Sequence, residues 1–234
     1  MVTVSLSNGS FIICLALTFF INYLCHVPPT PTPEATPTKP YWKDRIEVLN
    51  VVSWNTWITT LLALVWTYHL SLILFPTLHS TVCRHPELLN EDLFTWSTHS
   101  TLYIIAVFIF GMMRLAAYAK LGENFTFGLT VPSGLITTGL YHYIQHPSYV
   151  ALFVVRAADF LFVERLDGVA ACVLPERIVR VNGLSGGFAG VSMVLFAYGI
   201  SLRVRDEEEM LSKEFGKEWK IWHKRTKRFI PGLW

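Results

Sequence analysis

The chain has 234 residues, of which 52% are hydrophobic and only 15% charged, with a formal net charge of +2. Soluble domains carry roughly a quarter charged residues, so the composition favours a protein with several membrane helices. The small net charge offers no general basic surface and excludes nucleic acid as a partner. The four cysteines share no metal-ligand or CxxC spacing, and they are interpreted as small apolar packing residues: Cys14, Cys25, Cys83 and Cys172.

The N-terminal part of the chain is one apolar segment followed by a linker. Residues 11–25, FIICLALTFFINYLC, predict a short first membrane span within residues 1–26. A secretory signal peptide is the alternative, although the segment has neither a basic region before it nor a clear cleavage site. Residues 27–50 form a Pro/Thr-rich linker, because its prolines remove backbone donors and prevent a helix.

Residues 51–234 are predicted to form one membrane domain. Further apolar segments give an all-α fold with about five membrane helices; they cover residues 51–75, 93–119, 149–163 and 184–202. Arg114, near the end of the second of these segments, is expected to extend its charged group to the membrane surface.

A charged amphipathic helix is expected after residue 203, with its apolar face on the membrane or on the other helices. That face consists of Met210, Leu211, Phe215, Trp219 and Trp222. Nine Lys or Arg residues lie between Arg203 and Arg228, which places this end of the chain in the cytosol. Counting five spans backwards puts residues 119–148 on the same side.

Two polar stretches lie at the ends of apolar segments: residues 139–149, GLYHYIQHPSY, and residues 203–209, RVRDEEE. Polar groups are expensive to hold at a membrane edge and usually mark a site. Pro147 keeps His146 out of a helix, so the first stretch is expected to present its side chains from a turn.

Arg203 and Glu207 are four residues apart and share one face of a helix. The alternative is a solvated surface, with ion pairs to Lys213 and Lys217 and with the tyrosines as interfacial anchors. Spacing alone therefore indicates a site without indicating its reaction.

The pattern G-[LV]-Y-x-x-x-x-H-P-S-Y, followed by R-x-x-x-E-E, F-G and a tail ending near a proline, resembles the isoprenylcysteine carboxyl methyltransferase family. The resemblance covers roughly the C-terminal half, residues 122–234, and related phospholipid methyltransferases share its core. It is carried by Gly139, Tyr141, His146, Pro147, Ser148, Tyr149, Arg203, Glu207, Glu208, Phe215, Gly216 and Pro231.

The resemblance implies an enzyme that transfers a methyl group from S-adenosylmethionine to the C-terminal carboxylate of prenylated cysteine in CaaX-type proteins after proteolysis. It implies no metal, membrane lipid around the prenyl chain, and a cytosol-facing site in the endoplasmic reticulum membrane. Arg203, facing the substrate carboxylate, and Glu207 are the implied catalytic residues. The implied cofactor-binding residues are Ser133, Gly134, Leu135, Ile136, Tyr141, His146, Pro147, Ser148, Tyr149 and Glu207.

These residue types suit the chemistry. A carboxylate is already ionised at neutral pH, so methylation needs alignment in a water-poor pocket rather than a strong base. Arginine suits a planar carboxylate. The chain also has no GxGxxG after a strand, so a Rossmann cofactor site is not expected.

The pattern is broken in three places. Gln145 stands where many members of the family have arginine, and Ala151 or Leu152 replaces a glycine. The charged residues 156–183 lengthen the last hairpin by roughly twenty residues, as a lumenal insertion or as a translated intron. Two other functions therefore stay open: methylation of a phospholipid or another lipophilic acceptor, against which Arg203 argues, and an inactive membrane homologue that acts as a binding protein.

Overall fold

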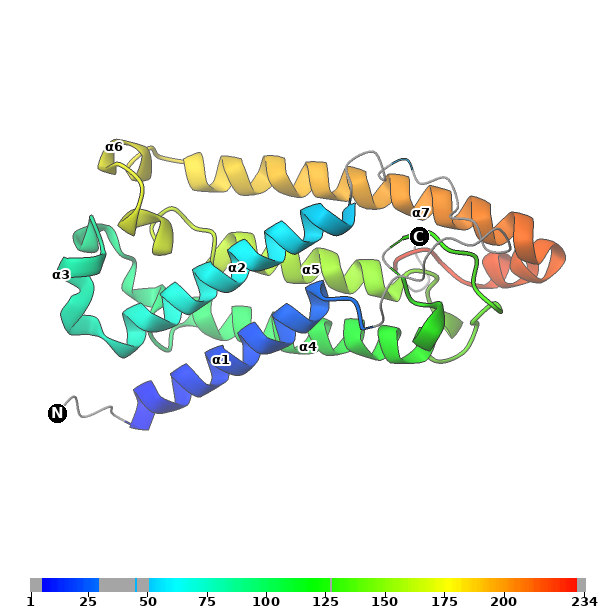
Figure 1. Ribbon diagram of the computed structural model, residues 1–234, viewed down its shortest axis with the longest axis horizontal. Coiled ribbons are helices and arrows are strands. Elements are labelled where there is room, and N and C mark those ends of the chain that lie inside the picture. Colours follow the sequence, from blue (N-terminus) through cyan, green and yellow to red (C-terminus); the bar gives the residue numbers. More distant parts are fainter. Residues whose placement is uncertain (1–5, 30–44, 46–50, 127, 231–234) are drawn as a thin grey trace.

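In a computed structural model of the protein, the described residues are 6–29, 45, 51–126 and 128–230. The regular structure of these residues is helical (Figure 1), which confirms the expected all-α fold. The predicted linker lies outside the described residues except for 27–29 and residue 45.

Four of the described helices are long and apolar enough to cross a membrane. They are α1 (Leu6–His26), α2 (Val51–Leu74), α4 (Thr98–Leu121) and α7 (Leu184–Arg225). The fourth predicted span, residues 149–163, corresponds to α5 (Pro147–Phe162), whose 16 residues are fewer than the roughly 20 that a bilayer requires. The predicted apolar segments are thus present as helices, and one of them is too short to cross by itself.

Local chemistry sets the helix ends. Pro76 follows α2 and cannot continue its hydrogen bonding. At the start of α4, the Ser97 side chain accepts from the Ser100 amide while the Ser100 hydroxyl accepts from the Ser97 amide. Gly122 ends α4 with φ 54°, a conformation that glycine adopts without a steric penalty. Pro147 begins α5, where its missing N–H costs nothing.

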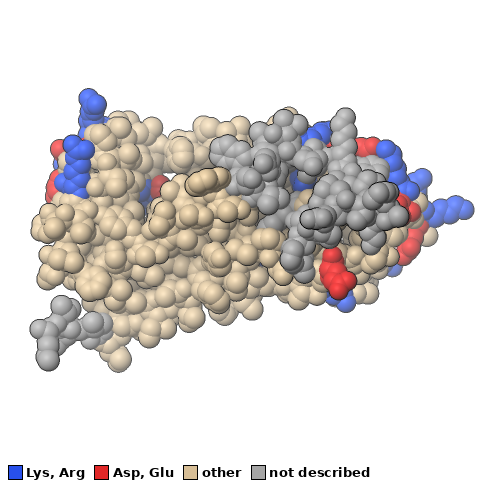
Figure 2. Space-filling view, in the orientation of Figure 1, with Lys and Arg blue, Asp and Glu red and all other residues tan. Residues whose placement is uncertain are grey.

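The core is formed where α1, α2, α4 and α5 pack together, and α7 joins the bundle through contacts with α5. Aromatic rings fill much of this core: Tyr103 of α4 stacks on Phe162 of α5, and Phe19 of α1 stacks on Trp66 of α2. On the face shown in Figure 2, charged side chains gather at the two ends of the molecule and leave an uncharged band between them. This distribution fits a protein that spans a membrane.

The first half of α7 leaves a broad apolar face uncovered, which a lipid bilayer would contact. Its exposed side chains are Phe188, Val191, Val194, Leu195 and Tyr198. The sequence predicted a span that ends near residue 202 and a separate charged helix after it, whereas α7 (42 residues) continues past this point and is divided by a kink at Gly216. Only Gly216, with φ 47° and ψ −108°, departs from helical geometry within it.

The charged residues 156–183 fold into the molecule as the end of α5, η7 (Val169–Cys172) and α6 (Glu176–Val179). Arg156 lies 3.2 Å from Asp159 and 2.8 Å from Glu164. Asp159 also accepts from Asn22 of α1 at 2.7 Å and from Tyr103 at 3.1 Å. Residues 156–183 therefore compensate the charge of Arg156 among themselves, and α1 and α4 supply the hydrogen bonds to Asp159.

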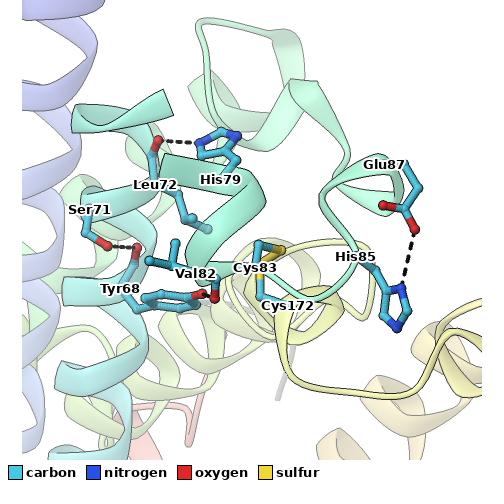
Figure 3. The surroundings of a disulfide bond; sticks show 9 residues. All are labelled: Tyr68, Ser71, Leu72, His79, Val82, Cys83, His85, Glu87 and Cys172. Atoms are coloured by element: carbon cyan, nitrogen blue, oxygen red, sulfur yellow. Dashed lines mark hydrogen bonds and ion pairs between the residues drawn. A yellow bond between two sulfur atoms is a disulfide. The ribbon is translucent and has the colours of Figure 1, made fainter. Parts of the chain in front are cut away.

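A disulfide joins Cys83 and Cys172 across 89 positions (Figure 3), so the prediction that these two cysteines are packing residues is wrong. The bond connects the loop after α3 (His79–Val82) to η7, and the Arg84 amide donates to the Cys172 carbonyl at 3.1 Å. Spacing in the sequence gives no signal for a pair so far apart. Cys14 and Cys25 are free.

Candidate functional site

The two polar stretches meet at the end of the bundle opposite to the disulfide (Figure 1). The Tyr149 hydroxyl donates to Oε2 of Glu207 at 3.0 Å. The His146 ring lies between two carboxylates, with Nε2 3.4 Å from Oε1 of Glu208 and Nδ1 4.0 Å from Oε1 of Glu207. The structure thus brings together residues that are 58 to 62 positions apart.

Backbone hydrogen bonds hold the turn before α5 against the C-terminal tail. The amides of Gln145 and His146 donate to the carbonyls of Lys227 and Arg228 at 2.8 and 3.0 Å. Ile144 and Lys227 also form a parallel bridge. Because His146 precedes Pro147, its backbone stays outside the helix, at φ −125° and ψ 58°, and remains open to this pairing.

Gln145, which stands where many members of the family have arginine, makes two side-chain contacts with the C-terminal part of the chain. Its amide nitrogen donates to the Thr226 hydroxyl at 3.0 Å, and its oxygen lies 3.0 Å from Nδ1 of His223. An arginine at position 145 could not replace the contact with His223, because a guanidinium has no hydrogen-bond acceptor. Gln145 therefore fastens the turn to the end of α7.

The acidic stretch of α7 divides between a buried and an exposed side. Arg203, Asp206 and Glu208 are buried, whereas Glu209 is exposed and pairs with Lys213 at 2.7 Å. Glu208 accepts two hydrogen bonds from Arg228, at 2.8 and 2.7 Å. A fully solvated surface would not bury these charges, so the buried side of the stretch does not fit that alternative.

Asp206 is held from outside the helix bundle. Nε of Arg45 lies 3.1 Å from its Oδ1, and the Arg45 amide donates to its Oδ2 at 2.9 Å. A residue of the predicted linker therefore contacts α7 beside the predicted catalytic pair.

An apolar and aromatic cluster forms one wall next to these charges. The expected apolar face of the last helix lies on this cluster rather than on the membrane. Trp222 donates to the Tyr141 carbonyl at 2.8 Å, and burial, followed by the nearby Glu207, raises the pKa of Tyr141 above its ordinary value. The cluster consists of Ala117, Leu129, Tyr141, Met210, Leu211, Trp219 and Trp222, with Leu135, Ile136 and Phe215 packed against it.

Two predicted residues lie apart from this cluster. The amide and hydroxyl of Ser133 donate to the Asn124 side chain at 2.9 and 3.0 Å, in an exposed loop. Gly134 has open space where a side chain would project. Their part in binding a cofactor stays a prediction.

Sequence reasoning missed two arginines. Arg114, expected to reach the membrane surface, is instead buried and donates to the Ser148 hydroxyl at 2.7 Å. A lone arginine in an apolar helix is a signal that could have found it. Arg228 is one basic residue among many in the tail, and no pattern in the sequence distinguishes it from the others.

The described part of the chain holds no group of three or more His, Cys, Asp or Glu side chains that could bind a metal ion. Its titratable residues near the turn are instead arranged as hydrogen-bonded pairs with arginine, histidine and tyrosine partners.

Comparisons with known proteins confirm the resemblance found in the sequence. Residues 102–181 match the model of the isoprenylcysteine carboxyl methyltransferase family. Over 131 residues the chain is 29% identical to a protein-S-isoprenylcysteine O-methyltransferase of Dictyostelium discoideum. That alignment covers 53% of this chain and 46% of the relative, so the chain matches about half the length of the relative.

Proposed function

We propose that the chain is an integral-membrane methyltransferase that uses S-adenosylmethionine to methylate the C-terminal carboxylate of prenylated cysteine in proteins. The observation that carries the proposal is the meeting of the His146–Tyr149 turn with Glu207 and Glu208 of α7. The similarity to the family over residues 102–181 supports it.

The residues at the turn fit the proposed cofactor, which would supply a methyl group activated on a sulfonium. Glu207 places carboxylate oxygens where a positive group would be stabilised. The buried indole N–H of Trp219 has no partner among the described residues, and a heterocyclic acceptor would satisfy it. Tyr141, Leu135 and Ile136 would surround such a ring with apolar surface.

Arg203 would orient the acceptor. It is buried, and it lies one helical turn before Glu207 on the same helix face. In a water-poor site a guanidinium binds a carboxylate more strongly than in water, and its fork fixes the direction of both oxygens. No proton has to be removed from an ionised carboxylate, so alignment is the main contribution that the protein makes.

Two independent features support a cytosolic site in the membrane of the secretory pathway. Disulfides persist in oxidising compartments, so the Cys83–Cys172 bond supports a lumenal position for that end of the molecule. The basic C-terminal end of α7 lies at the other end of the molecule, as the positive-inside rule requires of a cytosolic face (Figure 1). The apolar half of α7 would lead a prenyl chain from the bilayer towards Arg203.

The test is methyl transfer from labelled S-adenosylmethionine to N-acetyl-farnesylcysteine in membranes that contain the parent chain, Arg203→Ala or Arg205→Ala. Arg205 lies two residues further along the helix and is exposed, so it serves as the matched control. We expect a base-labile methyl ester from the parent and the control, and a loss of at least about a hundredfold in Arg203→Ala.

Other outcomes separate the alternatives. Cofactor binding without ester formation would indicate a different acceptor, such as a phospholipid. Absence of both binding and transfer in a folded protein would indicate an inactive homologue. An ester formed equally by Arg203→Ala would remove Arg203 from the reaction.

A further inference from the structure

Arg114 of α4 connects the C-terminal end of α1 with the start of α5. Arg114 is 3% exposed and sits among α1, α4 and α5, at the site end of α4. Its Nε donates to the Cys25 carbonyl at 2.8 Å. Its Nη1 donates to the carbonyl and the hydroxyl of Ser148 at 2.9 and 2.7 Å. One guanidinium thus binds the end of one helix and the first turn of another.

The charge of Arg114 has a specific source of compensation. The last carbonyls of a helix have no partner within the helix, and together they carry a partial negative charge. Cys25 is the next-to-last residue of α1, and its carbonyl also accepts from the Tyr118 hydroxyl at 2.8 Å. The Tyr118 ring lies under the guanidinium, 4.8 Å from its carbon. The end of α1 therefore provides a fixed and buried anchor.

The anchor is rigid because its own surroundings are fixed. The side chain of Asn55 in α2 donates to the His26 carbonyl at 2.6 Å. Asn22, one turn earlier in α1, donates to Asp159 of α5 at 2.7 Å. These bonds tie α1 to both neighbours, so a displacement of its C-terminal end would break several buried contacts.

Ser148 lies between His146 and Tyr149, the two residues that contact the carboxylates of α7. A group that fixes Ser148 therefore fixes the direction of both side chains. We propose that Arg114 is a positioning residue, which holds the His146–Tyr149 turn against the end of α1 and so sets the geometry of the proposed cofactor site. This inference rests on the proposed function, and it gives the C-terminal end of α1 a role in the geometry of the cofactor site.

Arg114→Lys tests the inference, because lysine keeps the charge while a single nitrogen cannot reach Cys25 and Ser148 in the same geometry. We expect the KM for S-adenosylmethionine to rise about tenfold or more. Val107→Ala in the same helix is the control: Val107 is fully buried in the core, away from the turn. It should lower the unfolding temperature and leave that KM within about twofold of the parent. Equal changes in KM for the two variants would overturn the inference.

A double variant tests the route through Ser148. If Arg114 acts through that residue, Arg114→Lys combined with Ser148→Ala should have a KM close to that of the worse single variant. Multiplied effects would overturn the route. Should Arg114→Lys not fold, Tyr118→Phe, which removes the second donor to the Cys25 carbonyl, should raise the same KM more than Val107→Ala does; equal KM values for these two variants would contradict the inference. Failure of the parent to bind or transfer would instead overturn the proposed function, so the two failures are distinguishable.

Discussion

His146 and Glu208 lie 62 positions apart in the chain, yet Nε2 of the first is 3.4 Å from Oε1 of the second. Arg228 binds the same carboxylate through two hydrogen bonds, so three distant segments share one acidic group. The carboxylate of Glu208 therefore joins the turn, α7 and the C-terminal tail.

Glu208→Gln removes the charge at this junction while preserving the shape of the side chain. We expect a loss of about 1–2 kcal/mol in the free energy of unfolding, because a half-buried ion pair loses one partner. Methyl transfer should fall with it, since one of the contacts that hold the tail beside the turn would be weakened while the backbone hydrogen bonds remain. Thermal unfolding in detergent measures the first effect. Glu209→Gln, on the exposed side of the same helix, should change stability by less than about 0.5 kcal/mol; equal losses for the two variants would contradict the junction.

The disulfide predicts the number of reactive thiols. The chain has four cysteines, so a denatured but unreduced sample should bind two molecules of a bulky maleimide, and a reduced sample four. Cys83→Ser should leave three reactive thiols in both samples and should lower stability by roughly 2–4 kcal/mol. Four reactive thiols without reduction would show that the bond does not form in the cell.

The proposed orientation predicts which surface cysteines an impermeant reagent can reach. Lys224 is exposed in the last turn of α7, and Val173, which follows the disulfide, is also exposed. Each is replaced by cysteine in a separate variant. In sealed, right-side-out microsomes we expect Lys224→Cys to be labelled at once and Val173→Cys only after permeabilisation. The parent, with Cys14 and Cys25, gives the background. The reverse pattern would invert the topology.

Asp167 predicts a pH dependence at the disulfide end. Burial alone would raise the pKa of Asp167, but hydrogen bonds from Arg165 and Asn90 outweigh it and lower the pKa. A lowered pKa in the folded state stabilises the protein above the ordinary pKa, about 3.9, and this contribution disappears as the pH falls through the lower value. The unfolding temperature of the parent should therefore fall more steeply below about pH 4 than that of Asp167→Asn. Identical pH profiles would argue against the contribution.

Much of the architecture followed from periodicity and charge. Apolar segments of helical length predicted α1, α2 and α4 within a few residues, since a bilayer selects length and hydrophobicity directly. The convergence of residues 139–149 with Arg203–Glu208 was also expected, because counting the predicted spans puts both stretches on the same side of the membrane. Proline interrupts a helix, and residues four positions apart share one helix face, whatever the fold is. Both signals can therefore be recognised from the sequence alone.

The contacts that the sequence did not predict are long-range ones. Arg114 had an apolar environment but no visible partner, because its acceptors are a helix end and a turn that only packing brings together. The pairing of Cys83 with Cys172 depends on the course of α4 and α5 between them. Arg45 reaches Asp206 from a linker whose composition indicated only a spacer.

The disulfide also has a consequence for biosynthesis. A ribosome adds roughly 5–20 residues per second, so Cys83 would wait about 5–20 seconds for Cys172 to be made. During that time α4 and α5 have to enter the membrane as a hairpin, because the two thiols can react only in one compartment. A chain whose hairpin inserted the wrong way round would keep both thiols in the reducing cytosol, and a chain in which one of the two helices failed to cross would keep them on opposite sides. Only a correctly inserted chain can therefore form the disulfide, so chains with free thiols at Cys83 and Cys172 are distinguishable from correctly inserted ones.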